Sequence, residues 1–306
     1  MNVLSINNLT KYYKNVRALN GVSFNVPEAC TFGILGPNGS GKTTLLGIVT
    51  EVLKPTLGSF TIFEDDKTPK NIQRKSIGTL LETPNFYHYL SAEQNLRISA
   101  KIKGCGVSGI DDVLKKVGLY ERRNSKFSTY SLGMKQRLAI GAALLGNPKV
   151  LVLDEPTNGL DPEGIAEIRA LIKQLGAEGR TIIMASHLLD EVEKVCTHVA
   201  ILKSGDLLTA GRADEVLANE DIVEISAGDI DKLQIILAEM YPEQKIKRDN
   251  DTLYMYFASN NVDTEAINKY CFEHGIVLSK LFLKKKSLES MFLELIASNS
   301  KPGSHE

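Results

Sequence analysis

Paired cysteines are missing from this chain of 306 residues. Its four cysteines lie far apart, form no C-x-x-C pair, and are not near a histidine at the spacing of metal ligands. A disulfide framework and a zinc site are therefore not expected, and the pattern predicts reduced thiols in a cytosolic protein. The four are Cys30, Cys105, Cys196 and Cys271.

The chain also lacks an excess of positive or negative charge. The 36 Lys and Arg residues balance the 37 Asp and Glu residues, and the formal net charge is −1. Such a balance gives no electrostatic footprint for nucleic acid, so we expect no nucleic-acid partner.

Long apolar runs are also absent. No run reaches the roughly 18 residues that a membrane span needs. The first residues, MNVLSINNLTKYYK, lack the apolar core of a signal peptide. If the protein works at a membrane, another chain must provide the span.

What the chain does have is alternating strand-like and helix-like sequence, in a length that suffices for two domains. Residues 1–32 alternate as antiparallel strands do, with Val22, Phe24 and Val26 on one face. Three later runs have the composition of strands buried on both faces, namely TFGILG, PKVLVLDEP and RTIIMAS. Buried strands that alternate with helices predict an α/β fold with a mostly parallel sheet, whose ligands bind at the carboxyl ends of the strands.

Helical patterns connect these strands. KTTLLGIVTEVL follows the first run, and residues 77–145 are mostly helical in pattern, starting after a break at Pro84–Asn85. In DPEGIAEIRALIKQLG, Asp161 suits the N-cap and Pro162 the first helical position. An apolar stripe of this helix comprises Ile165, Ile168, Leu171, Ile172 and Leu175. HVAILKSGDLLTAG then has the pattern of a hairpin.

The pattern changes at about residue 221. DIVEISAG, TLYMYFA and IVLSKLFLKKK are strand-like, whereas DIDKLQIILAEMY, DTEAINKYCFEHG and SLESMFLELIA are helical in pattern. We therefore predict a first domain over 1–220, with a helical subdomain at about 84–145, and a small accessory α/β domain over 221–298. The tail, 299–306, is expected to be disordered.

One motif carries specific chemistry. GPNGSGKTT follows a buried strand, opens a helix and matches G-x-x-x-x-G-K-[ST]. Its glycines let backbone N–H groups converge on phosphate oxygens, and the helix N-terminus adds a partial positive charge. Lys42 is expected to reach the β and γ phosphates, and the Thr43 hydroxyl to ligate Mg²⁺. The candidate phosphate-binding residues are Gly36, Pro37, Asn38, Gly39, Ser40, Gly41, Lys42, Thr43 and Thr44.

Two acids end the second buried strand, and a histidine follows the third. Asp154 is expected to hold Mg²⁺, and Glu155 to orient and activate the attacking water. Phosphoryl transfer needs mainly positioning and charge stabilisation from a protein. His187 is a candidate donor to the γ-phosphate, although a lone histidine at a strand end is a weak signal.

Together these pieces resemble the ATP-binding cassette (ABC) family over residues 3–218. GPNGSGKTT resembles its Walker A motif, VLVLDEPTNGLD its Walker B motif and D-loop with Asp161, and ASH its switch-histidine loop. YSLGMKQR resembles the family signature, LSGGQ, with Ser131 and Gly133 retained. In that family two cassettes dimerise head to tail, and each signature closes over the γ-phosphate held by the other chain. The resemblance implies ATP and Mg²⁺ as cofactors and adenine stacking on Tyr13, with Tyr12 as the adjacent alternative.

Three positions depart from the family pattern. Leu132 and Met134 replace a signature glycine and glutamine, and Glu82 stands where the Q-loop usually has Gln. Glu82 is a candidate Mg²⁺ ligand because it keeps a side-chain oxygen. With the C-terminal β/α appendage, these features resemble the bacitracin/lantibiotic-type exporter ATPases, which pair with a separate membrane permease. In the family, the region of FYHYL, 86–90, faces that permease; for Phe86, packing between subdomains is the alternative.

This resemblance predicts the ATPase subunit of a two-component transporter for a peptide antibiotic or related compound. The subunit would lie at the cytoplasmic face of the membrane, bound to the permease, and would pair with a second copy of itself or with a paralogous cassette. One alternative is a soluble cassette ATPase of translation or DNA repair, although the chain lacks a second cassette and a coiled-coil insertion. Another is an unrelated P-loop GTPase or kinase, although no N-K-x-D motif is present.

Overall fold

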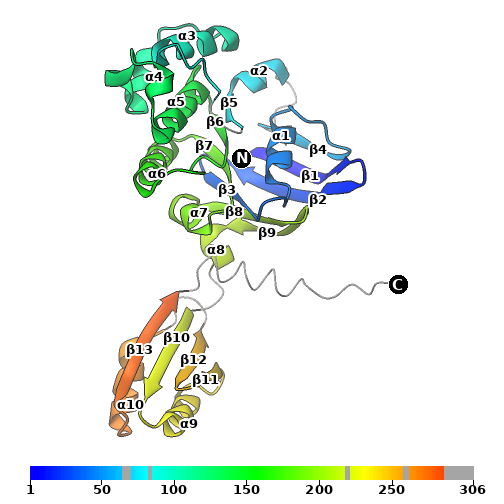
Figure 1. Cartoon of the computed structure of the whole chain (residues 1–306). Helices are drawn as coiled ribbons and strands as arrows, with labels where there is room; N and C mark the ends of the chain where they lie inside the picture. The colour runs from blue at the N-terminus through cyan, green and yellow to red at the C-terminus, as the bar shows by residue number, and fades with distance from the viewer. Residues whose placement is uncertain (64–69, 82–84, 218–220, 258–261, 286–306) are drawn as a thin grey trace. The chain divides into compact units, whose positions relative to one another are not determined.

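The structure is a computed structural model that describes residues 1–63, 70–81, 85–217, 221–257 and 262–285. The chain divides into two compact units, Met1–Ala213 and Asp214–Glu306 (Figure 1). We describe each unit separately.

A six-stranded mixed sheet forms the centre of the first unit. Its strand order is β5–β6–β7–β3–β8–β9, with five parallel strands and β9 antiparallel to β8. Every residue of β3, β6 and β7 is buried, as expected for apolar strands that are covered on both faces. The strands are β3 (Thr31–Leu35), β5 (Ile77–Leu80), β6 (Val150–Asp154), β7 (Thr181–Ser186), β8 (His198–Lys203) and β9 (Asp206–Arg212).

A smaller antiparallel sheet packs over one side of this centre. Its order is β2–β1–β4, with β1 (Asn2–Tyr13), β2 (Val16–Pro27) and β4 (Leu57–Ile62). Val22, Phe24 and Val26 are buried on one face of β2, as predicted, and Phe24 stacks on Phe32 of β3 at 5.3 Å between ring centroids. Helix α1 (Lys42–Val49) contributes to the same apolar cluster as these strands.

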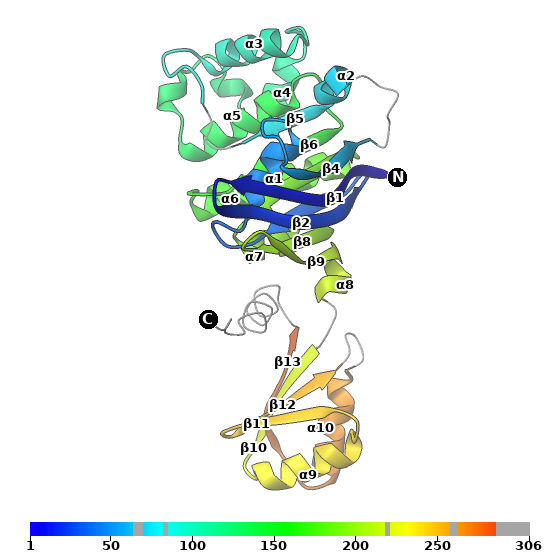
Figure 2. The ribbon, with the colours of Figure 1, turned by 90° about the vertical axis from the view of Figure 1, so that its right-hand side faces the viewer.

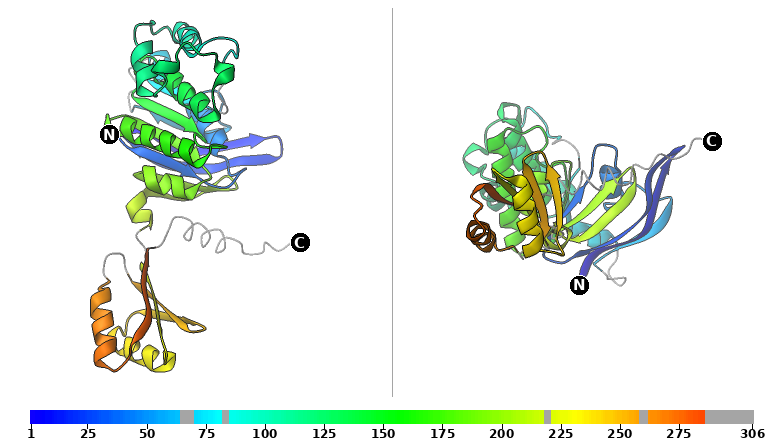
Figure 3. Two further views of the ribbon diagram at one scale, coloured as in Figure 1. Left: turned by 60° about the vertical axis from the view of Figure 1, so that its left-hand side comes forward. Right: turned by 90° about the horizontal axis from the view of Figure 1, so that it is seen from below.

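Six further α-helices complete the described part of the first unit, and α8 begins at its last residue, Ala213. The helices α3 (Ala92–Lys103), α4 (Ile110–Lys116) and α5 (Leu132–Leu144) gather at one end of the unit, whereas α6 lies along the central sheet (Figures 2 and 3). The Ser91 side chain and Gln94 form a capping box that starts α3, and Gly104 in the left-handed conformation ends it. The remaining helices are α2 (Lys70–Lys75), α6 (Pro162–Ala177), α7 (Leu189–Val195) and α8 (Ala213–Leu217).

Helix α6 begins as the sequence predicts. The Asp161 carboxylate accepts the Gly164 N–H at 3.0 Å, and Pro162 occupies the first helical position. Four of the five predicted stripe residues are buried, and Ile165 is half-buried. The stripe therefore faces the core.

The second unit is a β-α-β-β-α-β arrangement, the ferredoxin-like motif. Its antiparallel sheet has the order β11–β12–β10–β13, and its apolar core combines inward residues of the sheet with residues of both helices. The elements are β10 (Asp221–Ala227), α9 (Ile230–Met240), β11 (Lys245–Asp249), β12 (Thr252–Phe257), α10 (Thr264–Glu273) and β13 (Leu278–Lys285).

Three strands were not predicted from the sequence. The strand β4 is half-exposed or exposed, and β5 has only four residues within a region of mostly helical pattern. The edge strand β11, KIKRD, places only Ile246 against the core, so its composition resembles a polar loop. Helix α1 is shorter than predicted because Glu51, at φ 58°, no longer has a helical backbone.

All four cysteines are free thiols. Burial raises the pKa of Cys30 to about 11, and burial, together with the nearby Cys30, raises that of Cys196. Burial also raises the pKa of Cys271. These three thiols therefore stay protonated near neutral pH, which makes them poor nucleophiles.

Removal of residues 221–306 should leave a folded first unit. The apolar cluster around β1–β3 draws on residues between Val3 and Leu207, whereas the cluster of the second unit draws on residues between Val223 and Leu283. Since the two cores share no residue, the 1–220 chain should unfold in one cooperative thermal transition, followed by circular dichroism. A soluble chain without such a transition would show that the second unit completes the first.

Candidate active site

Three loops converge at the carboxyl edge of the central sheet. The strands β6, β7 and β3 are neighbours and run parallel, so the residues that follow each strand lie at the same edge. The loop 36–41 follows β3 and leads into α1, Glu155 follows β6, and His187 follows β7. The structure thus brings together segments that are far apart in the sequence.

Two glycines allow the 36–41 loop to pass close to its neighbours. A Cβ atom on Gly36 would lie 2.3 Å from the Leu202 carbonyl oxygen. Gly41 has φ +104°, and a Cβ atom there would lie 2.5 Å from the Ala18 carbonyl oxygen. Ser40 is buried, and its hydroxyl has no hydrogen-bond partner. No larger side chain fits at Gly36 or Gly41 without displacing backbone.

The ammonium group of Lys42 closes this loop. It donates to the carbonyl oxygens of Gly36 at 2.8 Å and Pro37 at 3.2 Å, and lies 3.4 Å from the Glu155 carboxylate. Lys42 is only 5% exposed. A buried ammonium group needs such partners because its desolvation is costly.

Glu155 links the loop to the third strand. Its carboxylate lies 2.8 Å from His187 Nδ1, and because an ionised carboxylate only accepts, Nδ1 must carry the proton in this contact. The backbone of Glu155 has φ 45°, and its N–H donates to the Ala185 carbonyl at 3.0 Å. A non-glycine residue held in this region stores strain of order 1–3 kcal/mol, a feature that clusters at functional sites.

Oxygen donors for a divalent cation lie at the same edge. Asp154 ends β6 and is 5% exposed, whereas Thr43, in the first turn of α1, is exposed to solvent. Glu82, the third predicted ligand, lies outside the described residues. Within the described chain, no group of three or more His, Cys, Asp or Glu side chains could hold a metal by itself.

The signature segment is positioned at the start of α5. Ser131 is its N-cap and accepts the Met134 N–H at 3.2 Å, and both Ser131 and Leu132 are exposed. A Cβ atom on Gly133 would lie 3.7 Å from Gly164 of α6, so this end of α5 lies beside the Asp161 cap. Among the described residues, no hydrogen bond or ion pair joins Ser131 or Gly133 to the phosphate-type loop of the same chain.

The two candidate adenine-stacking tyrosines end β1. Tyr13 is 43% and Tyr12 is 44% exposed, so neither is a core residue. The Lys11 ammonium lies 5.1 Å from the Tyr13 ring centroid. Tyr13 pairs with Val16 at the turn between β1 and β2. Ala18, two residues further along β2, lies against Gly41 of the 36–41 loop.

Sequence reasoning did not single out two buried hydroxyl residues at this edge. Thr157 is 3% exposed, and its hydroxyl has no hydrogen-bond partner. Ser186 is fully buried, and its hydroxyl accepts the Leu188 N–H at 3.0 Å, which fixes the turn after His187. The only sequence signal for them is proximity: Thr157 lies two residues after Glu155, and Ser186 directly precedes His187.

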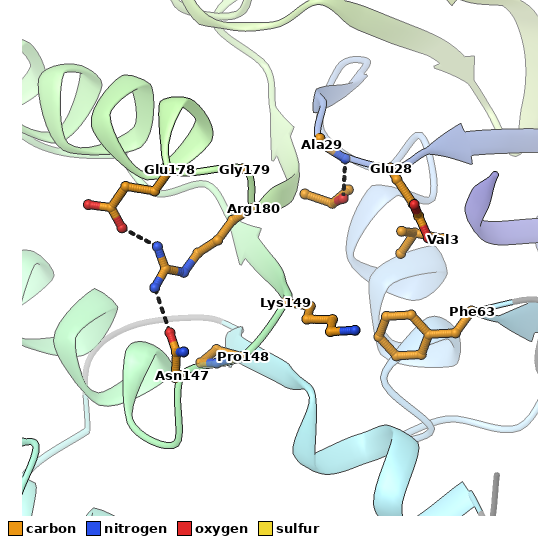
Figure 4. Close-up of a pocket in the computed structure, with 11 residues that line it drawn as sticks. Val3, Glu28, Ala29, Phe63, Asn147, Pro148, Lys149, Glu178, Gly179 and Arg180 are labelled. Carbon is orange, nitrogen blue, oxygen red and sulfur yellow. Dashed lines mark hydrogen bonds and ion pairs between the residues drawn. The ribbon is translucent and has the colours of Figure 1, made fainter.

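A separate cavity of about 470 Å³ lies at the opposite, amino edge of the sheet (Figure 4). Lys149 and Phe63 point toward one another across it, and Arg180 bridges Glu178 and Asn147. Since it contains none of the residues that converge at the carboxyl edge, it is not the candidate active site.

The fold and this loop arrangement define a P-loop nucleotide-binding ATPase. The family model described as ABC transporter matches residues 19–158. The bacitracin transport ATP-binding protein BcrA of Bacillus licheniformis is 37% identical over 303 residues, which cover 97% of this chain and 98% of that protein. The lantibiotic transport ATP-binding protein SrtF of Streptococcus pyogenes is 41% identical over 67% of this chain and 89% of its own length.

Solved structures agree with this assignment. The ADP conformation of MJ1267, an ATP-binding cassette of an ABC transporter, has a TM-score of 0.65 at 29% identity, over 70% of this chain and 92% of that one. A dimeric post-hydrolysis state of the cassette MJ0796, bound to ADP and Pi, has a TM-score of 0.61 at 29% identity, over 68% and 98%. The chain belongs to the ABC transporter family and is an ATP-binding ATPase subunit. The alternative of an unrelated GTPase or kinase is therefore wrong.

Gly41→Ala should destabilise the chain more than Gly39→Ala. Both positions have positive φ, at +104° and +80°, which costs an alanine about 1 kcal/mol. Only at Gly41 would the added methyl group also collide with backbone, whereas nothing lies within 4 Å at Gly39. Urea titration should give a free energy of unfolding at least about 1 kcal/mol lower for Gly41→Ala than for Gly39→Ala. Equal values would mean that the close approach to Ala18 is unimportant.

Proposed function

We propose that the loop 36–44 binds the ATP phosphates. Its backbone N–H groups and the N-terminus of α1 face the carboxyl edge of the sheet, an arrangement that favours anions. Lys42 would exchange its contacts with the Gly36 and Pro37 carbonyls for phosphate oxygens, and Ser40, with its unpartnered hydroxyl, would add a further donor. Tyr13 would stack on the adenine.

The donor set at this edge fits Mg²⁺. This ion takes oxygen ligands and usually combines one or two carboxylates with substrate phosphates, so it does not need a cage of protein acids. Thr43 and Asp154 would hold it, with Glu82 as the third predicted ligand. When bound, the ion would neutralise part of the charge on the phosphates.

For hydrolysis, we assign the water-activating role to Glu155. In this structure its carboxylate is shared between Lys42 and His187, both of which point into the same edge. Once Lys42 turns to the phosphates, the carboxylate could orient a water molecule and accept its proton. His187 would then donate a ring N–H to the γ-phosphate in place of its contact with Glu155.

A second cassette would complete the site. Ser131, which is exposed, and Gly133, which is half-buried, form the start of α5. Among the described residues, neither has a hydrogen bond to the loop of its own chain, and Asp161 lies beside them. The N-terminal N–H groups of α5 that Ser131 does not cap suit a phosphate held by a partner. The partner would be a second copy, arranged head to tail, or a paralogous cassette.

A membrane permease is the second proposed partner. Among the described residues, no helix is long and apolar enough to cross a membrane. A cavity of about 330 Å³ between 85–87 and α3 offers a docking position, with Ile102 81% and Tyr89 69% exposed nearby. Phe86 instead packs edge-on against Phe127 at 5.2 Å. We place the subunit at the cytoplasmic face of the membrane through this permease.

The transported compound would be a peptide antibiotic or a related molecule, and the direction would be export. This rests on the BcrA similarity, which extends over 97% of the chain and so includes the second unit. That full-length match also favours a transporter over a soluble cassette of translation or repair.

The observation that carries the proposed chemistry is the contact of Glu155 with both Lys42 and His187.

Glu155→Gln should keep ATP binding and reduce hydrolysis by about 10²–10⁴-fold, the usual contribution of a general base. The amide keeps the size of the side chain but cannot accept a proton from water. The measurements are the rate of phosphate release and the affinity for a fluorescent ATP analogue. Glu121→Gln, an exposed position outside the site, is the matched control. Hydrolysis within a few-fold of wild type would remove Glu155 from this role.

Ile102→Glu should leave the ATPase activity of the isolated chain unchanged and weaken its association with the permease. A charge at this exposed position would oppose an apolar contact in the neighbouring cavity. Co-purification with the permease from membranes measures the association, and Val277→Glu, 76% exposed in the second unit, is the control. Normal co-purification of both variants would place the permease contact elsewhere.

A further inference from the structure

The sheet of the second unit has one face that neither α9 nor α10 covers. Inward residues such as Val223, Leu253 and Met255 pack with both helices in one apolar cluster. Because successive strand residues point to opposite faces, their neighbours lie on the other side of the sheet. Phe282, on that side of β13, is 56% exposed.

The strand register shows what this open face contains. Glu224 lies between Phe282 and Tyr254, and Lys247 pairs with Tyr254 on the outer side. The next row runs Lys284, Ile222, Tyr256 and Lys245. The open face therefore has an aromatic and apolar middle with lysines on both outer strands. It comprises Ile222, Glu224, Ser226, Thr252, Tyr254, Tyr256, Phe282, Lys245, Lys247, Asp249, Lys280 and Lys284.

Lysines outnumber acids on the open face. On the open face, Lys280 pairs with Glu224 and the Lys247 ammonium lies 5.3 Å from the Tyr256 ring centroid. The acids of this face are Glu224 and Asp249, and further exposed acids lie on the helices, namely Asp231, Glu239, Glu265 and Glu273. The overall charge balance of the chain hides the excess of lysine on this face. An occupant of the open face should therefore combine an apolar stripe with negative charge.

The sequence directly after β13 has this composition. Residues 287–297, SLESMFLELIA, lie outside the described part of the chain, and their pattern predicts a helix. Four apolar residues recur at the spacing of one helix face, and two acids flank them. The apolar residues are Leu288, Met291, Phe292 and Leu295, and the acids are Glu289 and Glu294.

We propose that residues 287–297 of the same chain bind the open face as an amphipathic helix, with Phe292 over the tyrosines and the glutamates toward the lysines. Eleven helical residues would be about 16 Å long, close to the width of about 14 Å for four strands. The segment starts two residues after Lys285, so its covalent attachment gives a high effective concentration. A second copy is the weaker occupant because two lysine-rich faces repel each other.

The chain has no Trp, so one introduced indole reports on this contact without background. In full-length Phe292→Trp, fluorescence should be blue-shifted and shielded from acrylamide. Adding Phe282→Ser, or Lys245→Glu with Lys247→Glu, should shift the emission to the red and raise quenching, because each weakens the open face. Phe272→Ser, at a 71% exposed position of α10, should change neither property.

Three outcomes would overturn the proposal. One is an indole that is fully quenched in the otherwise unchanged chain. Another is a blue shift that disappears on dilution, which would assign the segment to a second copy. The third is a blue shift that appears only with anionic phospholipid vesicles, or that both open-face variants leave intact, which would place the segment on a membrane or elsewhere on the chain.

Discussion

The ammonium group of Lys42 holds the candidate active site together. It bridges two carbonyl oxygens of its own loop and the carboxylate of Glu155, so one buried charge joins the ends of β3 and β6. The contact of Glu155 with His187 extends this link to β7. The strand order makes these strands neighbours, and Gly36 and Gly41 give the loop room to fold back.

The proposed second cassette accounts for a signature segment that carries no catalytic group. Ser131, which is exposed, and Gly133, which is half-buried, form a helix start beside α6, and among the described residues neither is hydrogen-bonded to the loop of its own chain. Under the proposed function, the phosphate at this surface belongs to the ATP that a second cassette holds. The second unit has its own apolar core, built from residues between Val223 and Leu283.

The local features of the site could be predicted from the sequence, because each is encoded within a few residues. The phosphate-type loop, the Asp154–Glu155 pair and the Asp161 cap depend on adjacent residues and on recognisable strand and helix patterns. The Lys42–Glu155 contact depends on strand order across more than 100 positions, and no local pattern encodes it. The short strand β5 and the charged strand β11 were missed because only their neighbours make them strands. The open face could not be predicted from the sequence for the same reason: its lysines and tyrosines come together only through the register of four strands.

The central claim is that one ATP-binding site is completed by two chains. The most direct test is light scattering of the Glu155→Gln chain with ATP and Mg²⁺, since blocked hydrolysis should trap the closed state. The account predicts that the mass doubles with ATP, and that adding Ser131→Arg keeps the chain monomeric while monomer nucleotide binding persists. A chain that binds ATP yet stays monomeric in the Glu155→Gln background, or one that still dimerises with Ser131→Arg, would contradict the shared site.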